Sequence, residues 1–506
     1  MKRSKHSLSH YNLLSCDMGE LVPVGLQEVL PGDTFQHSTS VLTRVSPLLA
    51  PVMHPVHVRL HHWFVPHRLV WDDWEDFITG GPDGDNSSTF PTITLSTSGS
   101  PASADVGNLA DYLGCATGIN GLEVSALPFR AYSMIFNEWY RDEDLVTALT
   151  IDTTSGPDST TNTDLQNAAW QKDYFTSARP WTQKGTEVTI PLTGDAPITG
   201  LGKQDTTFGS ASQAVRETDG SGTVTYTNSA NVNGGSANTN FYVEEDPNNA
   251  GFPNVHADLS GVTAASINDL RLAFALQRYQ EARARYGSRY VEYLRYLDVR
   301  SSDARLQRPE YLGGGRQTIQ FSEVLQTAPT TSGNELGVAD LKGHGIGAMR
   351  SNRYRRFFEE HGYVISLLSV LPVTMYVQGL HRTLNRRTKE DFWQKELEHI
   401  GQQEILNKEL YAAHASPDGT FGYQDRYDEY RRTPSRVSGE FRTSSLDYWH
   451  MARIFASDPA LNSTFVTSDP TKRINAVQSE DVLWCMVNHS LQARRLVSKK
   501  GNSYIF

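Results

Sequence analysis

The chain of 506 residues is 38% hydrophobic, 10% aromatic and 20% charged, and its formal net charge is −11. This composition supports a folded core and excludes wholesale disorder; it also argues against a protein that coats its whole surface in nucleic acid, while leaving room for a basic face. The three cysteines, Cys16, Cys115 and Cys485, are odd in number and far apart, which excludes a disulfide framework and a CxxC metal knuckle.

The first residues resemble an export signal only in part. Leu13–Cys16 mimics a lipoprotein cleavage box, but polar residues such as Ser9 and Asn12 occupy the place of the apolar core. No stretch elsewhere reaches the roughly 20 apolar residues that span a bilayer. The sequence therefore predicts an unexported chain without membrane insertion.

Short runs typical of β-strands dominate the chain. Val56–His61 alternates apolar and polar residues, and the run continues to Pro66. Val364–Val377 is predicted as a buried strand pair and Val482–Val487 as a further strand. These strands are widely separated in sequence, which is typical of a mainly β protein with long connections.

Helices are few. Trp71–Ile78 places its aromatic residues on one side and its acidic residues largely on the other. A second helix is expected to begin near Ser266, where Asp269 completes a capping box. Glu390–Tyr411 is predicted as a third helix.

Two stretches, residues 80–108 and 150–260, are too rich in small and polar residues to bury much apolar area alone. Long loops in compact proteins are usually functional, or are projections stabilised by a partner. Within the longer insert, Thr223–Thr227 alternates as a strand does and indicates a hairpin. We therefore expect a single domain over residues 1–506, a β-sandwich with a short and a long inserted loop.

Charge is distributed unevenly. Trp71–Asp158 holds fifteen acidic residues against two basic ones, whereas residues 350–395 hold nine basic and four acidic ones. Arg271, Arg278 and Arg285 recur every seven residues, so on a helix they lie within roughly 40° of one another. For any single run of charged residues, an ordinary solvated surface is as good an explanation as a binding site. The arginine stripe suits DNA phosphates and the carboxylates of a neighbouring subunit alike, because arginine binds both in bidentate fashion.

Residues that carry chemistry in other proteins form no complete constellation. His57 and His61 would share a strand face, as zinc ligands can, but no third ligand accompanies them. Glu138 and Asp142–Asp144 offer carboxylates for glycoside hydrolysis, but a solvated helical face is the simpler interpretation. The glycine runs at 313–315 and 343–347 lack the context of a phosphate or dinucleotide loop. The sequence predicts no catalytic residue, no cofactor and no metal.

Six motifs follow one another along the chain. His61–Trp74 reads HHWFVPHRLVWDDW, Asn137–Asp142 reads NEWYRD, Ser302–Gly314 reads SDARLQRPEYLGG and Pro434–Arg442 reads PSRVSGEFR, with Asp173–Trp181 and Ile267–Arg271 between them. In this order they resemble segments of the major capsid proteins of gokushovirus-like Microviridae, small icosahedral single-stranded DNA bacteriophages. The long insert and the last forty or so residues depart from the family pattern, which leaves the subfamily open.

The resemblance implies a viral jelly roll, an eight-stranded antiparallel β-sandwich. Copies of the chain are then expected to close into a T=1 icosahedral shell around a circular single-stranded DNA genome. It also implies a place in the virion capsid, assembly in the bacterial host cytoplasm, and other virion proteins, such as a DNA pilot protein, as partners. The 150–260 insert is the natural candidate for a threefold surface projection that contacts a host receptor.

The basic ends of the chain are expected to meet the genome without sequence preference. Unpaired bases can stack on aromatic side chains near the C-terminal end. The candidate DNA contacts are Lys2, Arg3, Lys5, Arg494, Arg495, Lys499, Lys500, Tyr504 and Phe506, and Arg271, Arg278 and Arg285 are candidates for a subunit interface or for phosphate. Two other interpretations stay open here: another β-sandwich component of a virion, and a secreted β-sandwich that binds or cleaves carbohydrate.

Overall fold

The structure is a computed structural model in which the chain separates into two compact units, residues 1–182 with 286–506 and residues 183–285. It describes residues 3–82, 86–97, 102–186, 188, 198–206, 210–217, 223–226, 228–231, 241–248, 250, 254–257, 267–286, 295, 307–325, 327 and 341–499.

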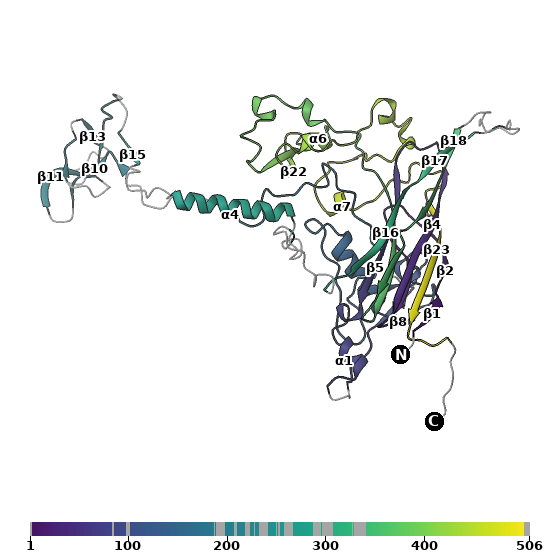
Figure 1. Ribbon diagram of the computed structural model, residues 1–506. Helices are drawn as coiled ribbons and strands as arrows, with labels where there is room; N and C mark the ends of the chain where they lie inside the picture. Colours follow the sequence, from purple (N-terminus) through teal and green to yellow (C-terminus); the bar gives the residue numbers. More distant parts are fainter. Residues whose placement is uncertain are drawn as a thin grey trace. The chain divides into compact units, whose positions relative to one another are not determined.

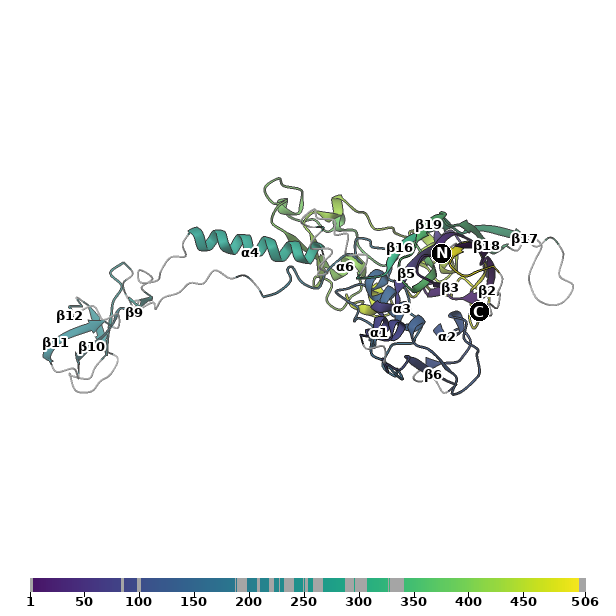
Figure 2. The same cartoon turned by 60° about the horizontal axis from the view of Figure 1, so that its bottom comes forward.

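The first unit is built on two antiparallel sheets that lie face to face (Figures 1 and 2). We call the seven-stranded sheet the open sheet and the four-stranded sheet the covered sheet. The open sheet contains β1 (Ser4–Ser7), β2 (His10–Cys16), β23 (Leu483–Arg495), β4 (Thr34–Leu48), β19 (Tyr354–Phe357), β18 (Leu341–Arg350) and β17 (Gln320–Leu325). The covered sheet runs in the order β16 (Glu310–Thr318), β5 (Val56–Pro66), β20 (Gly362–Pro372) and β3 (Leu21–Val29). This arrangement confirms the predicted mainly β, antiparallel sandwich.

The main hydrophobic core fills the space between the two sheets. Val58 of β5 and Val370 of β20 meet Val41 of β4 and Val487 of β23 in one buried cluster. Full burial of an aliphatic side chain contributes about 1.5–3 kcal/mol. The sandwich is therefore held mainly by alternate residues that point inward from both sheets.

The two sheets differ in what covers their second faces. Nearly every residue of β20 is buried, because its other face packs against a second core around Trp71, Phe129 and Tyr132. This core is carried by α3 (Leu127–Ile135) and a small sheet of β7 (Ala102–Ser103), β6 (Thr92–Ser96) and β8 (Glu123–Ser125). In β23, by contrast, buried and exposed side chains alternate. The open sheet therefore presents one face to solvent.

The connections of the first unit carry short helices and one more strand pair. β21 (Gln402–Leu406) and β22 (Thr420–Asp425) form a hairpin with its own core around Phe175 and Phe421. The short helices are η1 (His67–Leu69), α1 (Trp74–Thr79), α2 (Leu109–Tyr112), η2 (Phe136–Tyr140), η5 (Arg382–Leu384), η6 (Lys389–Asp391), α6 (Asn407–Leu410), η7 (Asp428–Tyr430), η8 (Gly439–Arg442), η9 (Asp447–Trp449) and α7 (Ser463–Val466).

The second unit contains a small antiparallel sheet and one long helix. The sheet runs in the order β12 (Thr223–Val224), β11 (Ser210–Glu217), β10 (Leu201–Thr206), β14 (Phe241–Glu244) and β13 (Ser229–Asn231), and β9 (Ile198–Thr199) pairs with β15 (His256–Ala257). The helix α4 (Ile267–Tyr286) follows. The strand predicted from Thr223 pairs with β11, whereas Thr227 and Ser266 lie outside the described residues. The helix expected after Ser266 is confirmed.

The structure corrects two predicted elements. Glu390–Tyr411 is not a helix: Gly401 adopts a φ of 110°, which ends any helix, and β21 begins at Gln402. Val364–Val377 is one strand rather than a pair, because β20 ends at Pro372, a residue that cannot donate to the sheet ladder. The helix predicted over Trp71–Ile78 is confirmed with a later start, at Trp74.

Candidate nucleic-acid interface

Two predicted DNA contacts lie opposite each other at the edge of the open sheet. Lys5 of β1 and Arg494 of β23 are cross-strand partners, and both side chains are exposed. Neither makes an ion pair with any described residue. Like charges directly opposite each other destabilise a sheet unless something neutralises them. The pair is therefore a suitable place for an anion.

Arg3 extends this basic edge. Its Nη1 donates to the carbonyl oxygen of Gly32 at 2.9 Å and to Oγ1 of Thr34 at 3.1 Å. Its guanidinium lies 5.4 Å from the ring centroid of Phe357 on β19. These contacts fix Arg3 beside the ends of β4 and β19, so that its charge adds to that of Lys5 and Arg494.

Arg495 has an internal partner. Its Nη2 donates to Oδ2 of Asp33 at 2.7 Å, and its guanidinium lies 5.7 Å from the centroid of Phe35. The Asp33 side chain is fully buried, so Arg495 neutralises a carboxylate that would otherwise be costly to bury. Lys499 is exposed. The candidates Lys2, Lys500, Tyr504 and Phe506 lie outside the described residues.

The arginine stripe lies on α4, as its spacing predicts. Arg271, Arg278 and Arg285 are all exposed on this helix. Leu272 and Phe274 of the same helix are 59% and 60% exposed. A helix that exposes both large apolar and basic side chains has the composition of a surface that binds a partner.

The histidines near residue 60 are divided between the two faces of β5. His57 and His61 share one face, where their Nδ1 atoms lie 3.0 Å from Oγ1 of Thr318 and 2.8 Å from the Tyr140 hydroxyl. Burial lowers the pKa of His61 to about 4. Among the described residues, no three His, Cys, Asp or Glu side chains are placed to hold a metal ion.

His62 points into the sandwich instead and joins a buried group with His37 of β4 and His489 of β23. His37 Nε2 lies 3.1 Å from Nδ1 of His489, and His62 Nδ1 lies 2.8 Å from Oγ of Ser366. Burial lowers the pKa of His37 to about 3 and that of His489 to about 4, and it lowers that of His62 well below the usual value. Neutral imidazoles therefore form this hydrogen-bonded network inside the core.

The carboxylates near residue 140 take part in ion pairs. Asp142 contacts the ammonium group of Lys172, and its Oδ2 lies 3.6 Å from Nη1 of Arg179. Asp144 lies 2.8 Å from Nε of the same arginine. Burial alone would raise the pKa of Asp142, but Lys172 and Arg179 hold it below the usual value. Both carboxylates thus connect two segments of the first unit.

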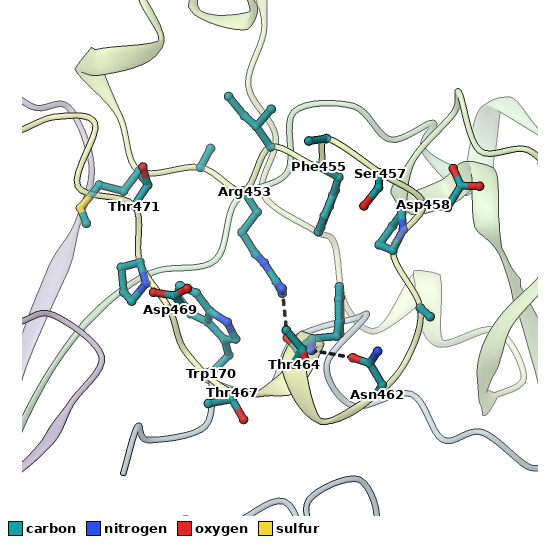
Figure 3. A pocket seen from close by; sticks show the side chains of 18 of the residues that line it. Trp170, Arg453, Phe455, Ser457, Asp458, Asn462, Thr464, Thr467, Asp469 and Thr471 are labelled. Atoms are coloured by element: carbon teal, nitrogen blue, oxygen red, sulfur yellow. Dashed lines mark hydrogen bonds between the residues drawn. The ribbon is translucent and has the colours of Figure 1, made fainter. Parts of the chain in front are cut away.

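A cavity of about 560 Å³ lies in the loops around α7 (Figure 3). Arg453 points into its centre, with its guanidinium 4.2 Å from the ring centroid of Phe465 and 5.3 Å from that of Trp170. Arg453 Nη2 donates to the Phe465 carbonyl oxygen at 3.0 Å. The cavity thus offers a cation among aromatic rings.

These features define a class of protein, a β-sandwich whose distinctive surface is a basic sheet edge. Among the described helices, none combines the length and apolar character needed to cross a bilayer.

The chain matches the family model described as "Capsid protein (F protein)" over residues 1–498 and belongs to that family. It is 38% identical over 497 residues to "Capsid protein VP1" of Bdellovibrio phage phiMH2K, covering 95% of this chain and 90% of that protein. Identity to "Capsid protein VP1" of Chlamydia phage 1 is 34% over 563 residues, covering 96% and 92% of the two chains. For "Capsid protein VP1" of Spiroplasma virus 4 it is 33% over 500 residues, covering 92% and 88%.

The resemblance to Microviridae capsid proteins is thereby confirmed, and the chain is a structural major capsid protein of a phage virion.

Proposed function

We propose that the chain, folded as an eight-stranded jelly roll, tiles with identical copies into a T=1 icosahedral shell around a circular single-stranded DNA genome. The antiparallel sandwich and the membership of the capsid protein family support this proposal. The observation that carries the genome contact is the pairing of two exposed like charges, Lys5 and Arg494, with Arg3 beside them. Such a basic edge attracts a phosphate backbone without sequence preference. The shell forms by association alone and requires no catalytic step.

The second unit and α4 serve contacts outside the sandwich. We assign the arginines and exposed apolar residues of α4 to an interface with a neighbouring copy, because obligate interfaces combine arginine with apolar side chains. The sheet of the 183–285 unit is the candidate for a threefold projection that contacts a host receptor. Assembly takes place in the bacterial host cytoplasm, together with other virion proteins such as a DNA pilot protein.

Electron microscopy of the expressed full chain tests the assembly. Closed icosahedral particles with T=1 symmetry are the expected result. Particles of another symmetry, or a chain that stays monomeric at every ionic strength, would contradict it.

Deletion of residues 202–247 removes most of the sheet of the second unit. Because the sandwich core contains none of these residues, we expect the variant to close into shells that fail to infect. Particle yield by microscopy and infectivity by plaque assay are the two measurements. A variant that forms no shell would show that the insert connects subunits instead.

Removal of charge from the basic edge and from the exposed Lys499, which follows β23, is expected to reduce packaging. In the variant Lys5→Gln/Arg494→Gln/Lys499→Gln, shells should still close but contain less DNA, because counterion release from phosphates is lost. The ratio of absorbance at 260 and 280 nm of purified particles measures this content. The matched control is Arg387→Gln/Lys389→Gln/Lys395→Gln, which removes the same kinds of exposed side chain elsewhere. Equal DNA content in both variants would exclude the edge from genome contact.

A further inference from the structure

The solvent-facing side of the open sheet, which we call the open face, combines basic and aromatic side chains across neighbouring strands. On β23 the outward residues start with Trp484 and Met486 and end with Arg494. Trp484 pairs with Arg44 of β4. Met486 pairs with Leu13 of β2. These pairings place residues from both ends of the sequence on one surface.

The apolar part of the open face is unusually exposed. Leu13 is 81% exposed and Tyr11 is 72% exposed, while Trp484 is 45% and Phe357 is 47% exposed. The solvent side of an antiparallel sheet is ordinarily polar. Aromatic and apolar side chains gathered on such a side therefore indicate a binding surface.

The exposed charged side chains that six strands contribute to the open face are basic, while Asp481, which precedes β23, accepts a hydrogen bond from Oγ of Ser15 on β2 at 2.6 Å. Arg44, Arg350 and Arg355 are exposed and form no ion pair with a described residue. Arg350 and Arg355 face solvent at the positions that pair with Ser40 and Gln36 of β4. Among the described residues that face solvent on β1, β2, β4, β18, β19 and β23, none is Asp or Glu. The positive charge of the open face therefore attracts a polyanion.

We propose that the open face is a binding site for single-stranded polynucleotide, in which unpaired bases stack on Trp484 and Tyr11 while Arg44, Arg350 and Arg355 contact phosphates. This assignment rests on the proposed function, and it places the open face on the inside of the shell. Aromatic side chains within a positively charged groove or face are the usual means of binding single strands without sequence preference. A DNA duplex offers no free base faces for stacking. Its binding to the open face would therefore gain only the electrostatic contribution of the arginines.

The dimensions of the open face suit several nucleotides. From Trp484 to Arg494 the strand β23 extends about 33 Å, at about 3.3 Å per residue. Single-strand sites of comparable proteins hold about 4–16 nucleotides. A second copy is the less suitable occupant, because a two-fold contact of this face with itself would bring the arginines of both copies together.

Photocrosslinking in wild-type particles tests the inference without any substitution. Ultraviolet irradiation, digestion and mass spectrometry should place nucleotide adducts on the peptides that contain Tyr11, Phe357 or Trp484. Particles without DNA would overturn the proposed function itself. Particles that carry DNA with adducts only elsewhere would overturn this inference alone.

Binding by the purified full chain separates stacking from charge. Trp484→Ala is expected to weaken binding of an oligothymidylate about tenfold and to leave binding of inorganic polyphosphate unchanged, while Trp484→Phe retains most of the affinity. Arg44→Gln should lower the slope of log affinity against log salt by about 0.7. The matched control is Trp393→Ala, which removes a tryptophan that is 50% exposed outside the open sheet.

Two outcomes would overturn the inference. One is an affinity of Trp484→Ala for oligothymidylate equal to that of Trp393→Ala. The other is a Trp484→Ala chain that binds DNA normally but no longer closes into shells, because a second copy would then cover the open face.

Discussion

The substitution Arg130→Met is expected to lower the free energy of unfolding by about 3–5 kcal/mol, because it leaves a buried carboxylate without its cation. The side chains of Arg130 and Asp158 are both fully buried, with Nε of the arginine 2.8 Å from Oδ2 of the aspartate. Arg130 Nη1 and Nη2 also donate to the carbonyl oxygens of Val70 and Thr154, at 3.0 and 3.1 Å. One guanidinium thus connects α3 to two separate loops.

Denaturant unfolding of the purified chain, followed by fluorescence, measures this cost. Arg68→Met is the matched control, since the Arg68–Glu360 pair is 28% and 32% exposed and such pairs contribute only about 0–1 kcal/mol. The double variant Arg130→Met/Asp158→Leu should recover part of the loss, because no lone charge then remains buried. Equal losses for Arg130→Met and Arg68→Met would contradict the buried role of this pair.

Acidification is expected to destabilise the sandwich through its buried histidines. Burial lowers the pKa of His37 to about 3 and that of His489 to about 4, below the usual 6.5 of the unfolded chain. Below pH 6.5 the unfolded chain therefore binds more protons than the folded one, and stability falls as the pH decreases toward 4; above 6.5 the full stability is present. For His489 alone the shift corresponds to about 3 kcal/mol.

Unfolding free energies measured between pH 7.5 and 4.5 test this expectation. His489→Gln should flatten the dependence on pH, whereas the control His344→Gln, at an exposed histidine of β18, should leave it unchanged. If the unfolding free energy of His489→Gln depended on pH as steeply as that of the wild type, this expectation would be contradicted. Gly25 packs directly against this histidine. A Cβ at position 25 would lie 2.7 Å from the His489 ring, so a larger residue at position 25 would displace the ring.

Local patterns predicted the sandwich well where burial differs between the faces of a strand. The alternation over Val56–His61 corresponds to β5, and the strand predicted over Val482–Val487 lies in β23. The helix predicted from Ser266 corresponds to α4. The helix predicted over Glu390–Tyr411 was wrong. The charged residues of this segment have high helix propensity, but Gly401 and the pairing of β21 with β22 decide its structure. Propensity is a weak prior where tertiary pairing competes with it.

The basic surface was only partly predictable. Lys5 and Arg494 were found because both ends of the chain are visibly basic. Arg44 and Arg350 are separated by some three hundred residues and come onto the same face only because β4 pairs with β18, where Arg44 lies opposite Ile346 and Arg350 opposite Ser40. The outward alternation from Trp484 to Arg494 was a readable signal, but a single sequence does not reveal which face of a sheet remains uncovered.

The pairing of β23 with β1, β2 and β4 has a consequence for biosynthesis. A nascent chain cannot complete the open sheet until β23 has left the ribosome, because the central strand of that sheet is the last to be translated. Closing so long a loop is slow, and the unpaired edges of β2 and β4 must wait for it. We therefore expect prematurely terminated chains to lack this sheet, and so to be unable to take the place of a finished subunit.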